Sequence, residues 1–187
     1  TIEQLTERVG TCDTLLLSVG LIPENEISRG MGVDMNPVTS GPKVNESLET
    51  SIEGVFACGN VLHVHDLVDY VSEEAAAAGR NAAAYVKLGE ARVQGGHEIT
   101  LHPIEGVRYT VPGTINVERM DENLTVRFRV GAVYRNCYVS AYFDDERVIH
   151  KKRPVVAPGE MEEIRLTKEQ LEKYSDLRTI TVKIEEA

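Results

Sequence analysis

Two histidines and an aspartate stand close together in the segment His63-Val64-His65-Asp66, with Asp69 nearby. These residue types bind metal ions, but a protein metal site needs three or four converging ligands, and the H-x-H spacing supplies only two. The spacing therefore predicts no metal ion here. Because an imidazole titrates near neutral pH, His63 and His65 are also candidate proton carriers in a reaction. The alternative, that both are polar residues of a loop, stays open.

A second candidate site is Gly59-Asn60, which follows the apolar run 55–58. Glycine lets the backbone pass close to a ligand, and the asparagine side chain offers both a donor and an acceptor. The alternative is a turn that ends a strand, with Asn60 in a left-handed conformation. Cys58 invites a redox interpretation, but it has no partner cysteine in the sequence nearby, which favours packing in the core.

The elements around these residues are predicted to be strand, glycine turn, loop and helix. The run 55–58 lies between Gly54 and Gly59 and is typical of a strand buried on both faces of a parallel sheet. Ser72 is the predicted N-cap of a helix over 72–88. Small residues recur at helical spacing and predict a face against which another backbone packs closely: Ala75, Ala78, Gly79, Ala82 and Val86.

Three stretches resemble the pyridine nucleotide-disulfide oxidoreductase superfamily. Residues 50–60, T-S-I-E-G-V-F-A-C-G-N, resemble its second flavin-binding signature, roughly T-x-x-x-G-(V/I)-(F/Y)-A-x-G-D. Residues 12–23 are similar to the segment in which the family's chain returns from the NAD(P)H domain to the FAD domain, and residues 78–80 resemble the E-G-R of the next helix. The order and spacing agree over residues 10–88. Asn60 stands where the family usually has Asp, as in some subfamilies of flavin-dependent dehydrogenase subunits.

The resemblance implies that residues 1–92 are the C-terminal half of a Rossmann-like FAD-binding domain. It implies FAD as cofactor, with Gly59 and Asn60 at its ribityl or pyrophosphate part, and NAD(P)H as a cofactor of the full-length protein. The implied enzyme is a flavin-dependent NAD(P)H oxidoreductase or dehydrogenase subunit. A fragment of this kind is expected to be inactive alone.

The same resemblance implies roles for the loop and the helix that follow. The helix N-terminus would face the pyrimidine edge of the flavin and stabilise negative charge on the reduced ring. The backbone N–H groups that would do so belong to Tyr70, Val71 and Ser72. His63 or His65 would be the proton carrier near the ring.

Residues 93–187 form a second predicted domain, which begins in the glycine-rich stretch 88–96. Its apolar residues alternate with polar ones, as in 124–130, where Arg127 and Arg129 are predicted to face solvent. The same pattern recurs in 139–143 and 180–184, with turns at 144–145 and 158–159 and a capping box at 167–170. These features predict a small antiparallel β-sandwich resembling an immunoglobulin-like domain. It carries no catalytic motif, so the alternative function is a non-catalytic module that docks a partner subunit.

Composition restricts the remaining possibilities. The chain has 187 residues and a net charge of −10, which argues against nucleic acid or an anionic membrane as partner. No apolar run reaches the roughly 18 residues of a membrane span, and the three scattered cysteines suit a reducing, cytoplasmic compartment. Because the family pattern has begun by Cys12, the chain is predicted to be a piece of a longer protein. We therefore expect residues 1–92 alone to associate with another copy or rearrange, and residues 93–187 to fold as a monomer.

Overall fold

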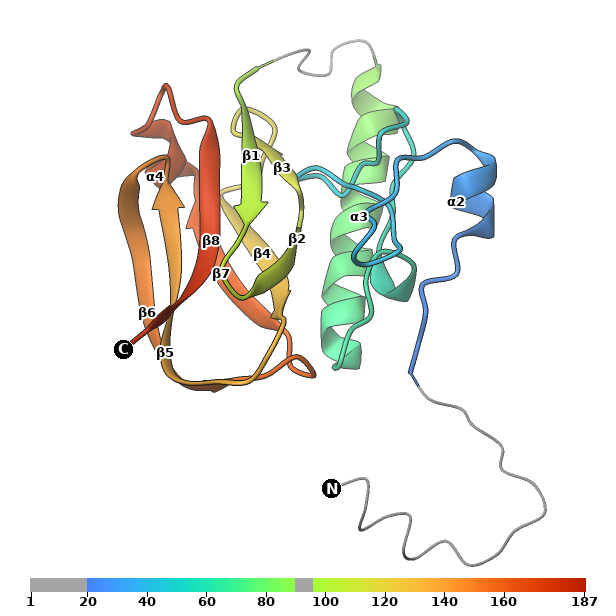
Figure 1. The fold of residues 1–187 in the computed structure, drawn as a ribbon. Helices are drawn as coiled ribbons and strands as arrows, with labels where there is room; N and C mark the ends of the chain where they lie inside the picture. Colours follow the sequence, from blue (N-terminus) through green and yellow to red (C-terminus); the bar gives the residue numbers. More distant parts are fainter. Residues whose placement is uncertain (1–19, 90–95) are drawn as a thin grey trace, which may run out of the picture.

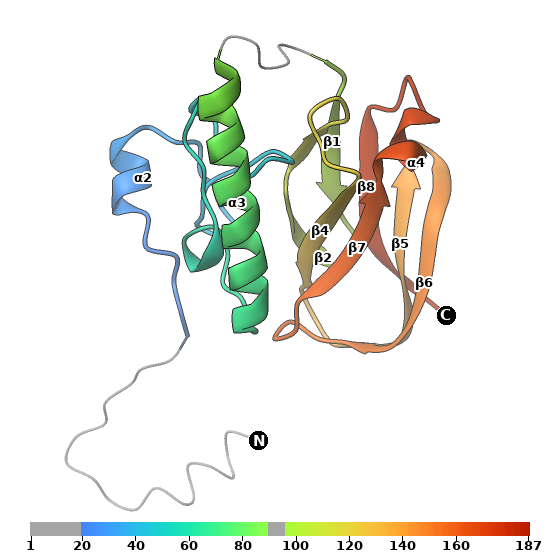
Figure 2. The ribbon, with the colours of Figure 1, turned by 180° about the vertical axis from the view of Figure 1, so that it is seen from behind.

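The computed structural model describes residues 20–89 and 96–187. The apolar run 14–19, predicted to be a strand, and the predicted domain boundary between residues 92 and 93 lie outside these residues. We call residues 20–89 the N-terminal segment and residues 96–187 the sheet unit (Figures 1 and 2). The helices of the N-terminal segment are α2 (Glu26–Gly30), the short 3-10 helix η1 (Gly59–Val61) and α3 (Val68–Leu88). The elements of the sheet unit are β1 (Glu98–Pro103), β2 (Val107–Val111), β3 (Thr114–Asn116), β4 (Asn123–Val130), β5 (Tyr134–Phe143), β6 (Glu146–Val156), β7 (Glu162–Thr167), α4 (Lys168–Glu172) and β8 (Thr179–Glu186).

The strands form two sheets, in the orders β3-β1-β8-β5-β6 and β2-β4-β7. β1 and β8 are parallel, and every other neighbouring pair in these orders is antiparallel. The fully antiparallel arrangement expected from the sequence is therefore wrong, because the last strand, β8, inserts between β1 and β5. Both sheets contribute side chains to one core, which includes Phe128 and Ile164 from one sheet and Val139 and Ile180 from the other. The fold is thus mixed α/β, and its likeness to an immunoglobulin-like domain stays a prediction.

Several local patterns in the sheet unit are confirmed. The alternating run 124–130 lies in β4, and the runs 139–143 and 180–184 lie in β5 and β8. The turn at 144–145 joins β5 to β6, as expected. Thr167 caps α4 by accepting a hydrogen bond from the backbone N–H of Gln170. Each of these patterns depends on contacts within or next to its own element.

The apolar run 55–58 does not form the predicted strand. Among the described residues, its backbone pairs only at an isolated bridge between Glu49 and Phe56. Gly54 and Gly59, with φ of 75° and 69°, turn the chain at both ends of the run. A strand is stabilised by a neighbouring ladder, and the described structure provides no strand beside this run. The Rossmann-like half-domain accordingly remains a prediction.

Helix α3 begins at Val68, one turn before the predicted N-cap. Its N-cap residue, Leu67, makes no side-chain capping bond, whereas the hydroxyl of Ser72 donates to the carbonyl of Val68 at 3.1 Å. The chain before the helix is held instead by Asp66, whose carboxylate accepts from the backbone N–H of Met161 in the sheet unit at 3.1 Å. A contact across this sequence distance leaves no local signal, so the predicted start was wrong.

The N-terminal segment and the sheet unit share an apolar cluster. Leu62 and Ala78 pack there with Tyr109 and Val111 of β2. Figures 1 and 2 both show α3 between the loops of the N-terminal segment and the sheet that contains β2 and β4. In the described parts of the chain, no helix combines the length and the hydrophobicity that crossing a membrane requires.

Candidate functional site

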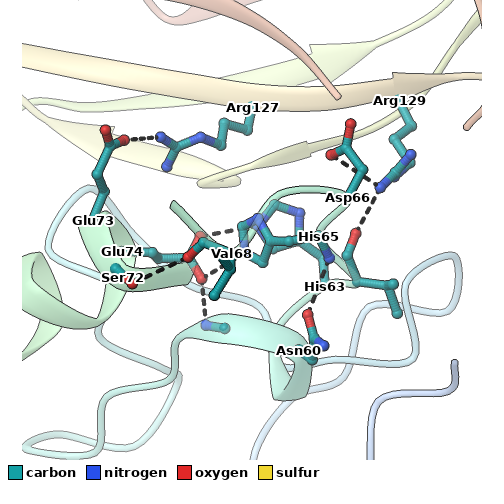
Figure 3. Close-up of polar contacts among 12 residues, drawn as sticks. Asn60, His63, His65, Asp66, Val68, Ser72, Glu73, Glu74, Arg127 and Arg129 are labelled. Atoms are coloured by element: carbon teal, nitrogen blue, oxygen red, sulfur yellow. Dashed lines mark hydrogen bonds and ion pairs between the residues drawn. The ribbon is translucent and has the colours of Figure 1, made fainter. Parts of the chain in front are cut away.

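The centre of the candidate site is the buried carboxylate of Glu74, in the second turn of α3. Its Oε1 accepts from the backbone N–H of Gly59 at 2.5 Å and lies 3.2 Å from Nε2 of His65. Its Oε2 lies 2.9 Å from Nε2 of His63 (Figure 3). The exposed fractions of His63, His65 and Glu74 are 1%, 8% and 4%. A buried carboxylate is stable only when donors surround it, and here three nitrogen atoms do so.

These contacts fix protonation states. Burial raises the pKa of Glu74, but the hydrogen bonds from His63 and His65 outweigh this effect and hold the pKa at about 2. Burial lowers the pKa of His63 more than Glu74 raises it. At neutral pH, Glu74 is therefore ionised and His63 is neutral, with its proton on Nε2. Burial, together with the charge of Glu74, also raises the pKa of the half-buried Cys58, which keeps it a thiol and argues against a redox role.

The three side chains also have the composition of a metal site. One ligand atom from each of His63, His65 and Glu74 lies within 4.8 Å of the others, so Glu74 supplies the third ligand that the H-x-H spacing lacks. If a metal ion took the Nε2 atoms, each imidazole proton would move to Nδ1. Neither buried Nδ1 has a hydrogen-bond partner in the described structure, and an unpaired buried donor is rarer than an unpaired acceptor. The contacts therefore favour a hydrogen-bonded network over a metal ion.

The two residues of the predicted glycine site, Gly59 and Asn60, lie in η1, just before the loop that leads to α3. Gly59 adopts a positive φ of 69°, a conformation that favours glycine. Asn60 is exposed, and its Oδ1 accepts from the backbone N–H of His65 at 3.1 Å. The predicted turn with Asn60 in a left-handed conformation is wrong, because the positive φ belongs to Gly59 and Asn60 lies in η1. Asn60 nevertheless stabilises the loop without a ligand. Its exposure also leaves the side chain accessible to one.

Only two of the three predicted backbone donors belong to the first turn of α3, where N–H groups have no acceptor within the helix. The first four N–H groups of a helix have no acceptor within it, and Tyr70 and Val71 belong to that first turn. Ser72 lies one residue beyond it. Because the helix starts earlier than predicted, Val68 and Asp69 also lie in this first turn, and their N–H groups have no acceptor within the helix.

Strand β4 brings Arg127 to the outer side of this helix turn. Its Nη2 lies 2.6 Å from Oε2 of Glu73, and its guanidinium carbon lies 4.8 Å from the centre of the Tyr70 ring. Arg127 is 9% exposed, so the prediction that it faces solvent is wrong. The second face of β4 is covered by α3, which the alternation within the strand cannot reveal.

Arg129 lies two residues further along β4 and contacts the loop that precedes α3. Its Nη2 donates to the carbonyl of Val64 at 2.9 Å and lies 3.5 Å from Oδ1 of Asp66 (Figure 3). The prediction that this side chain faces solvent is wrong for the same reason. The contacts of both arginines and the role of Glu74 were not predicted from the sequence. The available signals were the acidic pair Glu73-Glu74 at the predicted helix start and two arginines on one face of a strand.

Comparisons with known proteins agree with the motifs in the first half of the chain. Residues 2–82 match the family model described as Pyridine nucleotide-disulphide oxidoreductase. The chain is 30% identical over 127 residues to a dihydrolipoyl dehydrogenase of Trypanosoma brucei brucei, an alignment that covers 64% of this chain and 24% of that protein. The chain thus spans about a quarter of the relative's length. No solved structure matches it. Residues 2–82 are therefore similar to a segment of the pyridine nucleotide-disulphide oxidoreductase family.

Proposed function

We propose that the full-length protein is a flavin-dependent NAD(P)H oxidoreductase, and that this chain supplies the ribityl or pyrophosphate side and the pyrimidine side of its FAD site. One observation carries the proposal. Within the residues that match the family, the buried side chain of Glu74 connects the loop 59–65 to the start of α3. The bond from Gly59 N–H to Glu74 joins the beginning of the loop to the helix that ends it. A preformed backbone of this kind can present donors to a ligand without further ordering.

The surface around the start of α3 supports the same proposal. Val61, Leu67 and Val68 are 42%, 52% and 75% exposed. Exposed apolar side chains gathered beside free N–H groups suit a planar ring with polar edges, as in an isoalloxazine. Tyr70 and Val71 would place their N–H groups at the pyrimidine edge, and Gly59 and Asn60 would contact the ribityl or pyrophosphate part. Ser72 would contribute through its exposed side chain, because its backbone N–H lies beyond the first turn of the helix.

A proton-carrying role for His63 or His65 is a further part of the proposal. The Nε2 atoms of both rings are occupied by Glu74, and both Nδ1 atoms are without a partner in the described residues. A transferred proton would therefore enter or leave at Nδ1. In the same protein, NAD(P)H would reduce the flavin, and the chemistry of hydride transfer would belong to the two cofactors.

Absorbance of the purified full-length protein tests the proposal first, because bound flavin absorbs at about 450 nm. Asn60→Ala should lower FAD affinity by roughly 1–3 kcal/mol, since it removes side-chain hydrogen bonds, whereas Asn60→Asp should bind as well as wild type. The control is Asn123→Ala, which changes an exposed asparagine of β4. A wild-type protein without bound or bindable FAD would refute the proposal. An Asn60→Ala variant that matches the control would remove Asn60 from the site.

A further inference from the structure

One face of β4 is directed at the elements assigned to the flavin. Side chains two residues apart in a strand share a face, which places Arg127 and Arg129 together. Arg127 contacts the first two turns of α3, and Arg129 contacts the loop 63–66 (Figure 3). The sheet unit therefore touches both the helix start and the loop of the candidate FAD site.

The contacts of Arg129 hold the loop at two points and join it to the turn before β7. Its guanidinium donates to the carbonyl of Val64 at 2.9 Å and to the carbonyl of Pro158 at 3.0 Å, and it pairs with Asp66 at 3.5 Å. Asp66 also accepts from the backbone N–H of Met161 at 3.1 Å. The planar guanidinium makes these contacts from two nitrogen atoms held in fixed directions, whereas the ammonium group of a lysine would offer the same charge from a single nitrogen. The loop is thus fixed to β4 and to the turn before β7.

Arg127 holds the helix side of the same site. It packs over the ring of Tyr70 and pairs with Glu73, as described above. Because the Glu73 carboxylate is 65% exposed, the ion pair alone contributes little. The buried guanidinium on the Tyr70 ring is the contact that fixes the first turn, since a desolvated cation–π pair is stronger than an exposed one.

We propose that the sheet unit positions the flavin-facing loop and helix start, with Arg127 and Arg129 as its positioning residues. The inference rests on the proposed FAD site and gives residues 96–187 a part in it. Each arginine also neutralises a carboxylate near the site, so its removal would leave a negative charge that disfavours the reduced flavin, which carries more negative charge than the oxidised form. Removing either arginine should therefore loosen FAD and lower its reduction potential.

The experiment uses the full-length, FAD-loaded protein with Arg129→Gln, Arg127→Gln and Arg129→Lys. The control is Arg165→Gln, which changes an exposed arginine of the neighbouring strand β7. We expect Arg129→Gln to weaken FAD binding by roughly tenfold, as expected for the loss of charged hydrogen bonds, with a lower potential and an altered visible spectrum. Arg129→Lys should restore part of the potential, because it keeps the charge, but not the full affinity.

If Arg129→Gln fails to fold, Asp66→Asn tests the same contact from a partly exposed side chain and should weaken FAD binding in the same direction. FAD affinity, potential and spectrum equal to those of the Arg165→Gln control in all variants would overturn the inference, while leaving the FAD site itself intact. Loss of FAD from the wild-type protein would instead overturn the proposed function, and with it the inference.

Discussion

Replacing Glu74 by Gln tests whether the buried carboxylate is the centre of the site. The side chain keeps its shape, but one oxygen becomes an NH2 group that must face a donor. Only His63 can adapt, by moving its proton to Nδ1, and this buried atom has no partner among the described residues. Loss of charged hydrogen bonds and one unpaired donor together cost about 2–4 kcal/mol. The pKa gives a similar value, because the difference between 4.5 and about 2 corresponds to about 3 kcal/mol at neutral pH.

Thermal and urea unfolding of the wild type and the Gln variant measure this cost. A loss of about 3 kcal/mol corresponds to a melting temperature lower by about 6–12 °C for a chain of this length. The adjacent Glu73→Gln is the matched control, because its carboxylate is 65% exposed and its single ion pair is expected to contribute about 0–1 kcal/mol. A Glu74→Gln variant as stable as Glu73→Gln would refute the reasoning.

The pH dependence gives this prediction a second signature. A carboxyl group with a lowered folded-state pKa contributes its full stability above its unfolded pKa. The stability difference between wild type and Glu74→Gln should therefore be constant from pH 6 to 8 and should shrink as the pH falls from 4.5 toward about 2. A difference that grew in acid would mean that Glu74 is protonated in the folded protein.

Three further predictions concern other parts of the structure. Chelators such as EDTA should leave the melting temperature unchanged, because N–H groups of Gly59, His63 and His65 already satisfy the Glu74 carboxylate without a metal ion. A lower melting temperature after chelation would indicate a bound metal ion. Gly41→Ala should destabilise the protein by several kcal/mol, since its Cβ would overlap the carbonyl of Leu62, whereas Gly159→Ala, which meets nothing nearby, should be close to neutral in urea unfolding. Residues 93–187 should remain a folded monomer in sedimentation, because the main core lies within the sheet unit, and an unfolded or associated piece would contradict this.

The sequence was informative where a pattern reflects contacts close along the chain. The alternation in 124–130 and the capping box at Thr167 predicted β4 and α4, because period and cap depend on neighbouring residues. The family resemblance at 50–60 was also readable from the sequence, although its apolar run forms no strand here. A strand needs a partner, and the sequence of the run does not say whether one lies beside it.

The parts that could not be predicted depend on contacts between distant residues. Arg127 and Glu73 are 54 positions apart, and Arg129 and Val64 are 65 positions apart. An alternating strand shows that one of its faces is polar, but a polar face can meet solvent or the polar side of a helix. The role of Glu74 was missed for the same reason, because a helix-start glutamate suits the helix dipole whether or not it is buried.

The adjacent residues Glu73 and Glu74 explain how the two halves of the chain act on one site. Glu74 points inward and binds the loop through Gly59 and the histidines, while Glu73 reaches Arg127 of the sheet unit. One turn of α3 is thus bonded on one side to the loop and on the other to β4. The backbone proposed to face the flavin is consequently held from two sides, by Glu74 through the loop and by Arg127 through its contact with the Tyr70 ring. The sheet unit, in which the sequence shows no catalytic motif, would thus be part of the proposed cofactor site.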